Sequence, residues 1–190
     1  RGVFAKRPIK KGEVVSREGV FYAFPCQEGQ ILANDMSKYT QFTADRDFNI
    51  NEAIQLSETT TKNLREEIYS IVQNVKTFLK DSNVVIPDTA ALEISHHYGL
   101  ENFYETGITM VTVVNREYCK KLIIVLPSQS HPEQYHRKKE ETFVVLHGDV
   151  ELYLNEELHS LKKGDVITIE PGVNHRFTTT NGCVIEEVSS

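Results

Sequence analysis

Short apolar runs fill the last third of the chain and limit its fold more than any other feature. Between Ser128 and Ser190, at least five such runs are separated by turns that contain Gly, Asn and Pro. This spacing is typical of antiparallel sandwiches and barrels. We therefore predict a mostly β protein whose carboxyl-terminal part, residues 83–190, is an antiparallel double-sheet barrel.

The rest of the chain predicts a small β domain and a linking helix ahead of this barrel. Residues 1–56 contain short β-type runs and turn signals such as KKGE. Residues 57–82 place apolar side chains at steps of three and four, which is the period of one helix face. These side chains are Leu64, Ile68, Ile71, Val72, Val75 and Leu79. Ser and Thr residues at its start are candidate caps, and residues 81–83 end the predicted helix.

Composition limits the classes of ligand that the chain can bind and the cellular compartment in which it is expected. The net charge is −6, whereas proteins that bind nucleic acids usually carry a basic stripe, so we expect a small polar ligand and no nucleic acid. The three cysteines lack metal-type spacing and predict a reducing cytoplasm. No apolar run is long enough to span a membrane. Because the chain starts at Arg1 without a methionine, we expect a piece of a longer polypeptide.

Two polar stretches predict a metal site inside the barrel. They read HPEQYHRKKEETFVVLHG at 131–148 and GDVITIEPGVNHRF at 164–177. Gln134 and His136 lie two apart and share a strand face, and a turn at 137–140 lets Glu141 meet His136. The Pro-Gly turn at 171–172 can deliver His175 to the same interior. We predict that these four side chains hold one divalent ion, Zn, Mn, Fe or Ni.

Three further histidines have other interpretations. His131 is an alternative to Gln134 as a ligand, but its strand parity is opposite to that of His136 unless Pro132 breaks the strand. His147 has the parity of Glu141, yet its place beside a turn favours a structural role. His159 lies in a polar run and is interpreted as a surface residue.

The two polar stretches resemble the two cupin motifs. The glutamate, Glu141, stands seven positions before Gly148, and the second motif is filled by Gly164, the Pro-Gly turn and His175. The resemblance implies a double-stranded β-helix, or jelly roll, around a metal ion. One position departs from the pattern, because Gln134 stands where the cupin motif has the first histidine of a pair.

A wider resemblance covers residues 90–190. LEISHHYGLENFYETG, NREYCKKLIIVLP and CVIEEVSS are similar to cupins of the D-lyxose isomerase type. The resemblance implies a sugar or sugar acid as ligand and interconversion of aldose and ketose. On this interpretation Glu187 or Glu186 is the catalytic base and Lys120 or Lys121 steadies the substrate oxygen. His97 and Tyr118 are then candidate substrate contacts.

The first residues resemble another family. RGVFAKRPIKKGEVVSREGV and TADRDFN are similar to the antifreeze-like (SAF) domain that closes bacterial sialic acid synthases. This resemblance implies a β-clip fold, a homodimer and a synthase barrel upstream of Arg1. Phe24 precedes Pro25 where those synthases have an arginine before a proline.

Two functions besides isomerisation remain open from the sequence. The cupin could be a sugar-binding or regulatory module attached to a synthase of nonulosonic acids, an interpretation that Gln134 and Phe24 favour. An iron-dependent oxygenase uses similar ligands and predicts oxygen consumption with ferrous ion.

Overall fold

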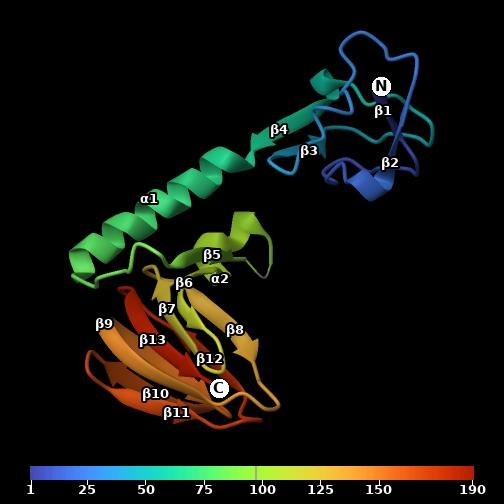
Figure 1. The fold of residues 1–190 in the computed structure, drawn as a ribbon. Helices are drawn as coiled ribbons and strands as arrows, with labels where there is room; N and C mark the ends of the chain where they lie inside the picture. The colour runs from blue at the N-terminus through green and yellow to red at the C-terminus, as the bar shows by residue number, and fades with distance from the viewer. Residues whose placement is uncertain (97) are drawn as a thin grey trace. The chain divides into compact units, whose positions relative to one another are not determined.

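The computed structural model describes residues 1–96 and 98–190 and divides the chain into two compact units (Figure 1). Unit 1 is Arg1–Val72 and unit 2 is Gln73–Ser190. Both units are built mainly from antiparallel strands, so the prediction of a mostly β protein is confirmed. Among the described residues, no helix has the length and apolar character needed to cross a bilayer.

Unit 1 contains two small antiparallel sheets around one apolar core. β1 (Gly2–Ala5) pairs with β2 (Val20–Ala23), and β3 (Thr40–Ala44) pairs with β4 (Thr59–Asn63). Two single-turn 3-10 helices, Arg17–Gly19 and Leu56–Glu58, lie at strand ends. The core consists of Val3, Ala5, Ile9, Val15, Val20, Ile31, Met36, Phe42, Ala44, Phe48 and Ile54.

Helix α1 (Leu64–Ser82) begins seven residues later than predicted. Thr59–Asn63 forms β4 instead, because these residues pair with β3. Asn63 then caps the helix, and its Oδ1 accepts a hydrogen bond from the Arg65 amide at 3.1 Å. The helix ends at Ser82, and Asn83 follows it with a φ of 56°, the left-handed conformation common after a last helical turn.

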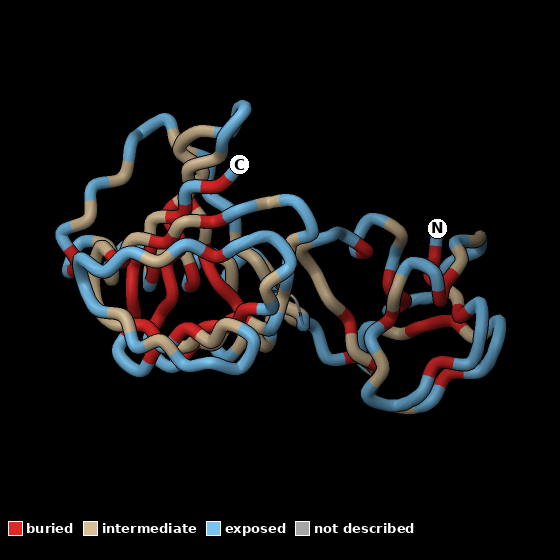
Figure 2. The backbone as a smooth tube through the Cα atoms, turned by 90° about the horizontal axis from the view of Figure 1, so that it is seen from below, coloured by how far each residue is buried: buried red, intermediate tan, exposed pale blue. Residues whose placement is uncertain are grey.

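Unit 2 contains one nine-stranded antiparallel sheet. Its order is β5-β6-β7-β13-β9-β12-β8, with β10 and β11 both paired to β9. The strands are β5 (Ala91–Ser95), β6 (Ile108–Asn115), β7 (Cys119–Val125), β8 (Ser130–Gln134), β9 (Glu141–Leu154), β10 (Glu157–Lys162), β11 (Val166–Ile169), β12 (His175–Thr178) and β13 (Cys183–Ser189). A 3-10 turn (Leu100–Asn102) and the short helix α2 (Phe103–Thr106) connect β5 to β6. In Figure 2 the buried segments of these strands line the inside of the curved sheet.

Strand β9 changes its inward face part-way along its length. Phe143 and Val145 are buried in the first half, and Val150 and Leu152 in the second, so the inward parity switches from odd to even. A β-bulge opposite Val184 and Ile185 inserts the extra residue that causes this switch. Gly148 follows the bulge with a φ of 75°, and a Cβ there would lie 2.1 Å from the Gly182 carbonyl oxygen, so only glycine fits.

Candidate metal centre

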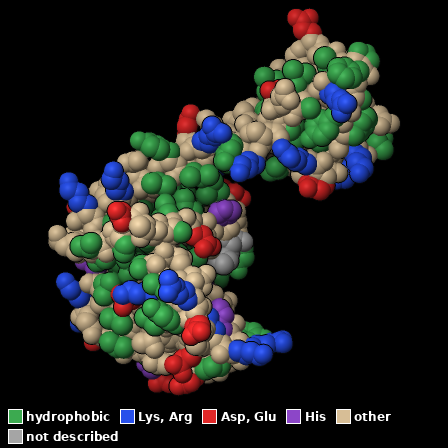
Figure 3. Space-filling view, in the orientation of Figure 1, with side chains coloured by type: hydrophobic (Ala, Val, Ile, Leu, Met, Phe, Trp, Pro, Cys, Tyr) green, Lys and Arg blue, Asp and Glu red, His purple; other side chains and the backbone are tan. Residues whose placement is uncertain are grey.

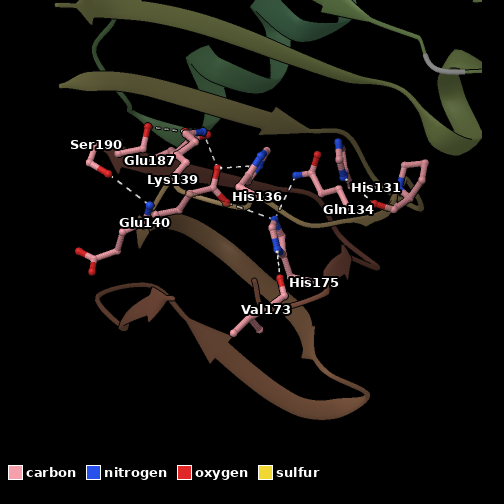
Figure 4. A network of polar contacts seen from close by, with 12 residues as sticks. His131, Gln134, His136, Lys139, Glu140, Val173, His175, Glu187 and Ser190 are labelled. Atoms are coloured by element: carbon pink, nitrogen blue, oxygen red, sulfur yellow. Dashed lines mark hydrogen bonds and ion pairs between the residues drawn. The ribbon is translucent and has the colours of Figure 1, made fainter. Parts of the chain in front are cut away.

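Three side chains from separate segments of unit 2 converge at one point. His136 follows β8, Glu141 begins β9 and His175 begins β12. Each offers one ligand atom, and these atoms lie within 4.8 Å of one another. Figure 4 shows His136 and His175 directed toward the same point. The structure therefore brings together the two imidazoles and the carboxylate that the motif spacing predicted.

The contacts of His175 direct its Nε2 at this point. Its Nδ1 lies 3.1 Å from the Val173 carbonyl oxygen, which can only accept, so Nδ1 carries a proton. Its Nε2 lies 3.1 Å from Glu141 Oε2. That carboxylate oxygen is buried and accepts no hydrogen bond from the described residues. Burial on its own lowers the pKa of His175, but contact with Glu141 and Val173 outweighs it and raises that pKa, so a proton on Nε2 can join these two atoms. A cation can replace that proton between the imidazole nitrogen and the carboxylate oxygen, so the residues fit a bound metal ion.

Gln134 stands beside the same point. It pairs with His175 in the β8–β12 register, so the two side chains lie side by side on neighbouring strands. Its Nε2 is 3.1 Å from His175 Nε2. The side chain is only partly buried and can turn its amide group. A neutral amide oxygen is therefore within reach of the point where His136, Glu141 and His175 meet.

A lysine joins Glu141 to a second buried carboxylate. Lys139 Nζ lies 2.6 Å from Glu141 Oε1 and 2.6 Å from Glu187 Oε1 (Figure 4). Burial on its own lowers the pKa of Lys139, but the two carboxylates outweigh it and hold that pKa above the usual value. Burial alone would likewise raise the pKa of Glu141, yet contact with His175 and Lys139 brings it down to about 2. Both carboxylate and ammonium are charged at neutral pH.

A cavity of about 210 Å³ opens beside this network. Its polar lining includes Glu93, Lys121, Gln134, His136, Lys139, Glu141 and Glu187. Ile108, Met110 and Ile123 form an apolar wall. The volume is below the range of sites for drug-sized ligands, so the cavity suits a ligand of single-sugar size.

The two predicted catalytic pairs are each split between the faces of the sheet. Lys121 and Glu187 pair across β7 and β13 and line the cavity. Lys120 and Glu186 point to the opposite face, where their charged groups form an ion pair of 2.7 Å. The structure therefore does not bring Lys120 or Glu186 to the cavity, because neighbouring strand residues face opposite ways.

Of the two predicted substrate contacts, Tyr118 is described by the structure and does not line the cavity. Tyr118 is half exposed in the turn between β6 and β7 and is absent from the cavity lining. His97 lies outside the described residues.

Bulges also change the positions of two histidines. The pairing of His175 with Gln134 and of Phe177 with His131 leaves an extra residue on β8, so His131 turns inward despite its parity. His131 lines the cavity, stacks on Phe177 and lies outside the three-ligand group. The β9 bulge turns His147 away from the face of Glu141, and its ring packs edge-on against Phe78 of α1.

Two charged cavity residues were missed from the sequence. Lys139 lies in the segment interpreted only as a turn, although its even spacing from Glu141 was a usable signal. Glu93 lies in β5, where the alternation of Glu93 with Leu92 and Ile94 could have indicated an inward carboxylate.

Comparison with known families supports the fold and the motifs. Residues 121–185 match the family model described as "Cupin domain". The cupin match contains Gln134, His136, Glu141 and His175, and it ends before Glu187.

Relatives extend the similarity beyond the cupin. A D-lyxose/D-mannose isomerase of Thermosediminibacter oceani is 26% identical over 166 residues, which cover 71% of this chain and 87% of the relative. The solved L-ribose isomerase of Acinetobacter sp. DL28, in complex with L-ribose, has a TM-score of 0.56 at 15% identity and covers 66% of this chain and 80% of its own. The L-ribose isomerase of Cellulomonas parahominis has a TM-score of 0.55 at 14% identity, with coverages of 66% and 83%. The two solved structures share the fold of the part of this chain that they cover.

Proposed function

We propose that the cupin domain holds one divalent metal ion and interconverts an aldose and a ketose at it. His136, Glu141 and His175 are the proposed ligands, with the amide oxygen of Gln134 as a fourth. The similarity to a D-lyxose/D-mannose isomerase supports a sugar as the substrate. Cavity volume supports a single sugar unit, or a sugar acid of that size.

The observation that carries this proposal is the second carboxylate beside the ligand set. Glu187 is 4% exposed and lines the cavity without belonging to the three-ligand group. Its Oε1 accepts from Lys139 at 2.6 Å and from the Ser189 hydroxyl at 3.0 Å. These two donors fix the carboxylate in one orientation and leave Oε2 for the substrate. A site that only stored metal would not need such a buried, oriented base.

The reaction is a proton transfer between adjacent carbons. Glu187 takes the proton from the carbon beside the carbonyl, and the electrons of that C–H bond form a carbon–carbon double bond while the carbonyl oxygen becomes negative. The hydroxyl proton then passes to this oxygen, and Glu187 returns its proton to the former carbonyl carbon. A divalent ion held by His136, Glu141 and His175 would supply polarisation of the carbonyl and stabilise the developing negative charge.

Lysines have separate roles in this scheme. Lys121 lines the cavity and forms no ion pair with the described residues, so its ammonium can donate to a substrate oxygen as the enediolate forms. Lys139 is a positioning residue, because both of its carboxylate contacts are to protein groups.

Incubation with sugars in deuterated water tests the activity. The metal-loaded chain is mixed with a panel of aldoses and ketoses, and NMR follows both product and deuterium. We expect isomerisation of at least one sugar, with deuterium at the former carbonyl carbon. Absence of both product and deuterium across the panel, with metal bound, contradicts the proposal.

A matched pair of variants tests the base. Glu187→Gln keeps the shape of the side chain and removes the base, so the turnover number should fall by about 10²- to 10⁴-fold. Glu186→Gln changes the neighbouring residue on the outer face and should leave turnover within about twofold. Equal losses in both variants would count against Glu187 as the base.

A second candidate is a sugar-binding module without turnover. Gln134, an amide in place of an imidazole, favours it because a weaker ligand holds metal less firmly. Calorimetry with hexoses, amino sugars and sialic acids separates the two, because a module binds its sugar and leaves it unchanged.

We further propose that residues 1–56 are an SAF-type β-clip domain joined through residues 57–82 to the cupin at 83–190. On this proposal the chain is the carboxyl-terminal part of a cytoplasmic, homodimeric protein like sialic acid synthase. The motif likeness at residues 1–20 supports it. Light scattering of the full chain tests the dimer, and a monomer at micromolar concentration contradicts it.

A further inference from the structure

Gln134 is the one member of the proposed ligand set that does not follow the cupin motif, and its surroundings explain what the change does. It is the last residue of β8 and lies directly opposite His175 in the register. The amide end therefore reaches the same height above the sheet as the His175 imidazole. An imidazole at position 134 would occupy this place and face the same point.

The amide is oriented here with its NH₂ group toward His175. Its Nε2 lies 3.1 Å from His175 Nε2, whose Nδ1 is committed to the Val173 carbonyl. A cation between His175 Nε2 and Glu141 Oε2 would meet the partial positive charge of that NH₂ group. The amide oxygen and nitrogen are nearly equal in size, so rotation about the last torsion presents Oε1 with little displacement of heavy atoms.

We propose that Gln134 sets the metal preference of the site, because its amide oxygen replaces an imidazole and favours oxygen-preferring divalent ions such as Mn²⁺ over Zn²⁺. The inference rests on the proposed metal centre. The donor set becomes two imidazole nitrogens, one carboxylate oxygen and one amide oxygen. Imidazole suits Zn²⁺, whereas carboxylate, carbonyl and water oxygens suit Mn²⁺ and Mg²⁺. Loss of one imidazole therefore weakens Zn²⁺ binding more than Mn²⁺ binding.

Competitive titration measures this preference directly. The full chain is stripped with a chelator, and the dissociation constants of Mn²⁺ and Zn²⁺ are measured with indicator dyes for the wild type and for Gln134→His. The histidine variant should raise the affinity for Zn²⁺ relative to Mn²⁺ by about tenfold or more. The visible absorption of bound Co²⁺ should also change, because a nitrogen ligand replaces an oxygen.

Two further variants make the result specific. Tyr135→His adds an imidazole at the adjacent position, where the wild-type side chain is 50% exposed, and should leave the Zn²⁺ to Mn²⁺ ratio within about twofold. Gln134→Leu keeps much of the side-chain bulk and removes the amide, so the Mn²⁺ affinity should fall by about tenfold.

The outcomes separate the inference from the metal centre itself. If the wild type binds neither ion, both the centre and the inference fail. If the wild type binds metal but Gln134→His leaves the ratio unchanged, or Gln134→Leu leaves the Mn²⁺ affinity unchanged, the inference fails and the centre stands. A shift in Tyr135→His as large as that in Gln134→His also overturns it.

Discussion

The two units differ in what they bury. Unit 1 has a core of aliphatic and aromatic side chains, and its ion pairs, such as Arg7 with Glu13, lie on the surface. Unit 2 buries Glu141, His175 and Glu187 at 2%, 1% and 4% exposure. Burial of ionised groups costs free energy that a hydrophobic core of the same volume would not. The buried polar groups of unit 2 therefore serve a chemical function at the expense of stability. The apolar core of unit 1 serves stability alone.

The distribution of surface side chains does not show this difference between the units. On the face seen in Figure 3, acidic, basic and hydrophobic side chains are interspersed over both units. The contrast lies in the interiors, so tests of it must compare buried positions.

The largest expected effect on folding is a cavity in the core of unit 1. Phe48 is 1% exposed, and Phe48→Ala should lower the free energy of unfolding by about 3–5 kcal/mol. Urea denaturation measures this change. Phe24 is 73% exposed, and Phe24→Ala should stay within about 0.5 kcal/mol of the wild type. Loss of metal affinity in the folded Phe48→Ala variant would contradict the conclusion that unit 1 contributes stability and unit 2 the metal site.

Metal loading should stabilise unit 2 alone. At a free ion concentration of about 100 times the dissociation constant, the bound state gains about 2.7 kcal/mol. Hydrogen exchange should slow in peptides that contain Glu141 and His175 and return to its original rate after chelation. Peptides from residues 1–56 serve as the internal control. Equal protection of both units, or of neither, would contradict the assignment of the metal to the barrel.

Buried and exposed lysines in unit 2 should differ by a smaller amount. Lys139→Met leaves Glu141 and Glu187 without their shared cation, so the metal-free chain should lose about 2 kcal/mol of stability. Lys120→Met breaks a more exposed pair with Glu186 and should cost less than about 1 kcal/mol. Denaturation in the presence of chelator measures both. Equal costs would mean that the Lys139 network is no better insulated from solvent than a surface pair.

Thiol labelling compares an exposed cysteine of unit 1 with a buried cysteine of unit 2 without a mutation. Burial raises the pKa of the Cys183 thiol to about 12, so at pH 8 it is protonated and shielded. Cys26 in unit 1 is exposed. Mass spectrometry after iodoacetamide treatment at pH 8 should find Cys26 modified and Cys183 intact. Modification of Cys183 in the folded chain at a rate similar to that of Cys26 would mean that this part of the barrel opens.

Strand alternation and turn spacing were sufficient to predict how three site residues meet. Glu141 reaches His136 across a short turn, and the Pro-Gly turn delivers His175, because both relations depend on local geometry. Alternation could not separate Glu186 from Glu187 or Lys120 from Lys121. Each pair has the same polarity at adjacent positions, and only the sheet pairing decides which member faces inward.

Bulges explain the remaining differences between sequence and structure. An extra residue on β8 turns His131 inward, and another on β9 turns His147 outward. Such insertions depend on the register between neighbouring strands, and no residue type predicts them. Lys139 was missed for a different reason, because a turn lysine is usually solvated and this one is ordered by two buried carboxylates.

Glu141 is the first residue of β9, the strand that pairs with β10, β11, β12 and β13. Its backbone is thus anchored in the most extensively bonded part of the sheet, whereas His136 and Gln134 border a turn. Sequence drift in that turn can therefore alter ligand identity and metal choice while the carboxylate stays in register. The fold thus fixes the position of Glu141 and lets the residues at positions 134 and 136 change. This arrangement favours the evolution of a new metal specificity.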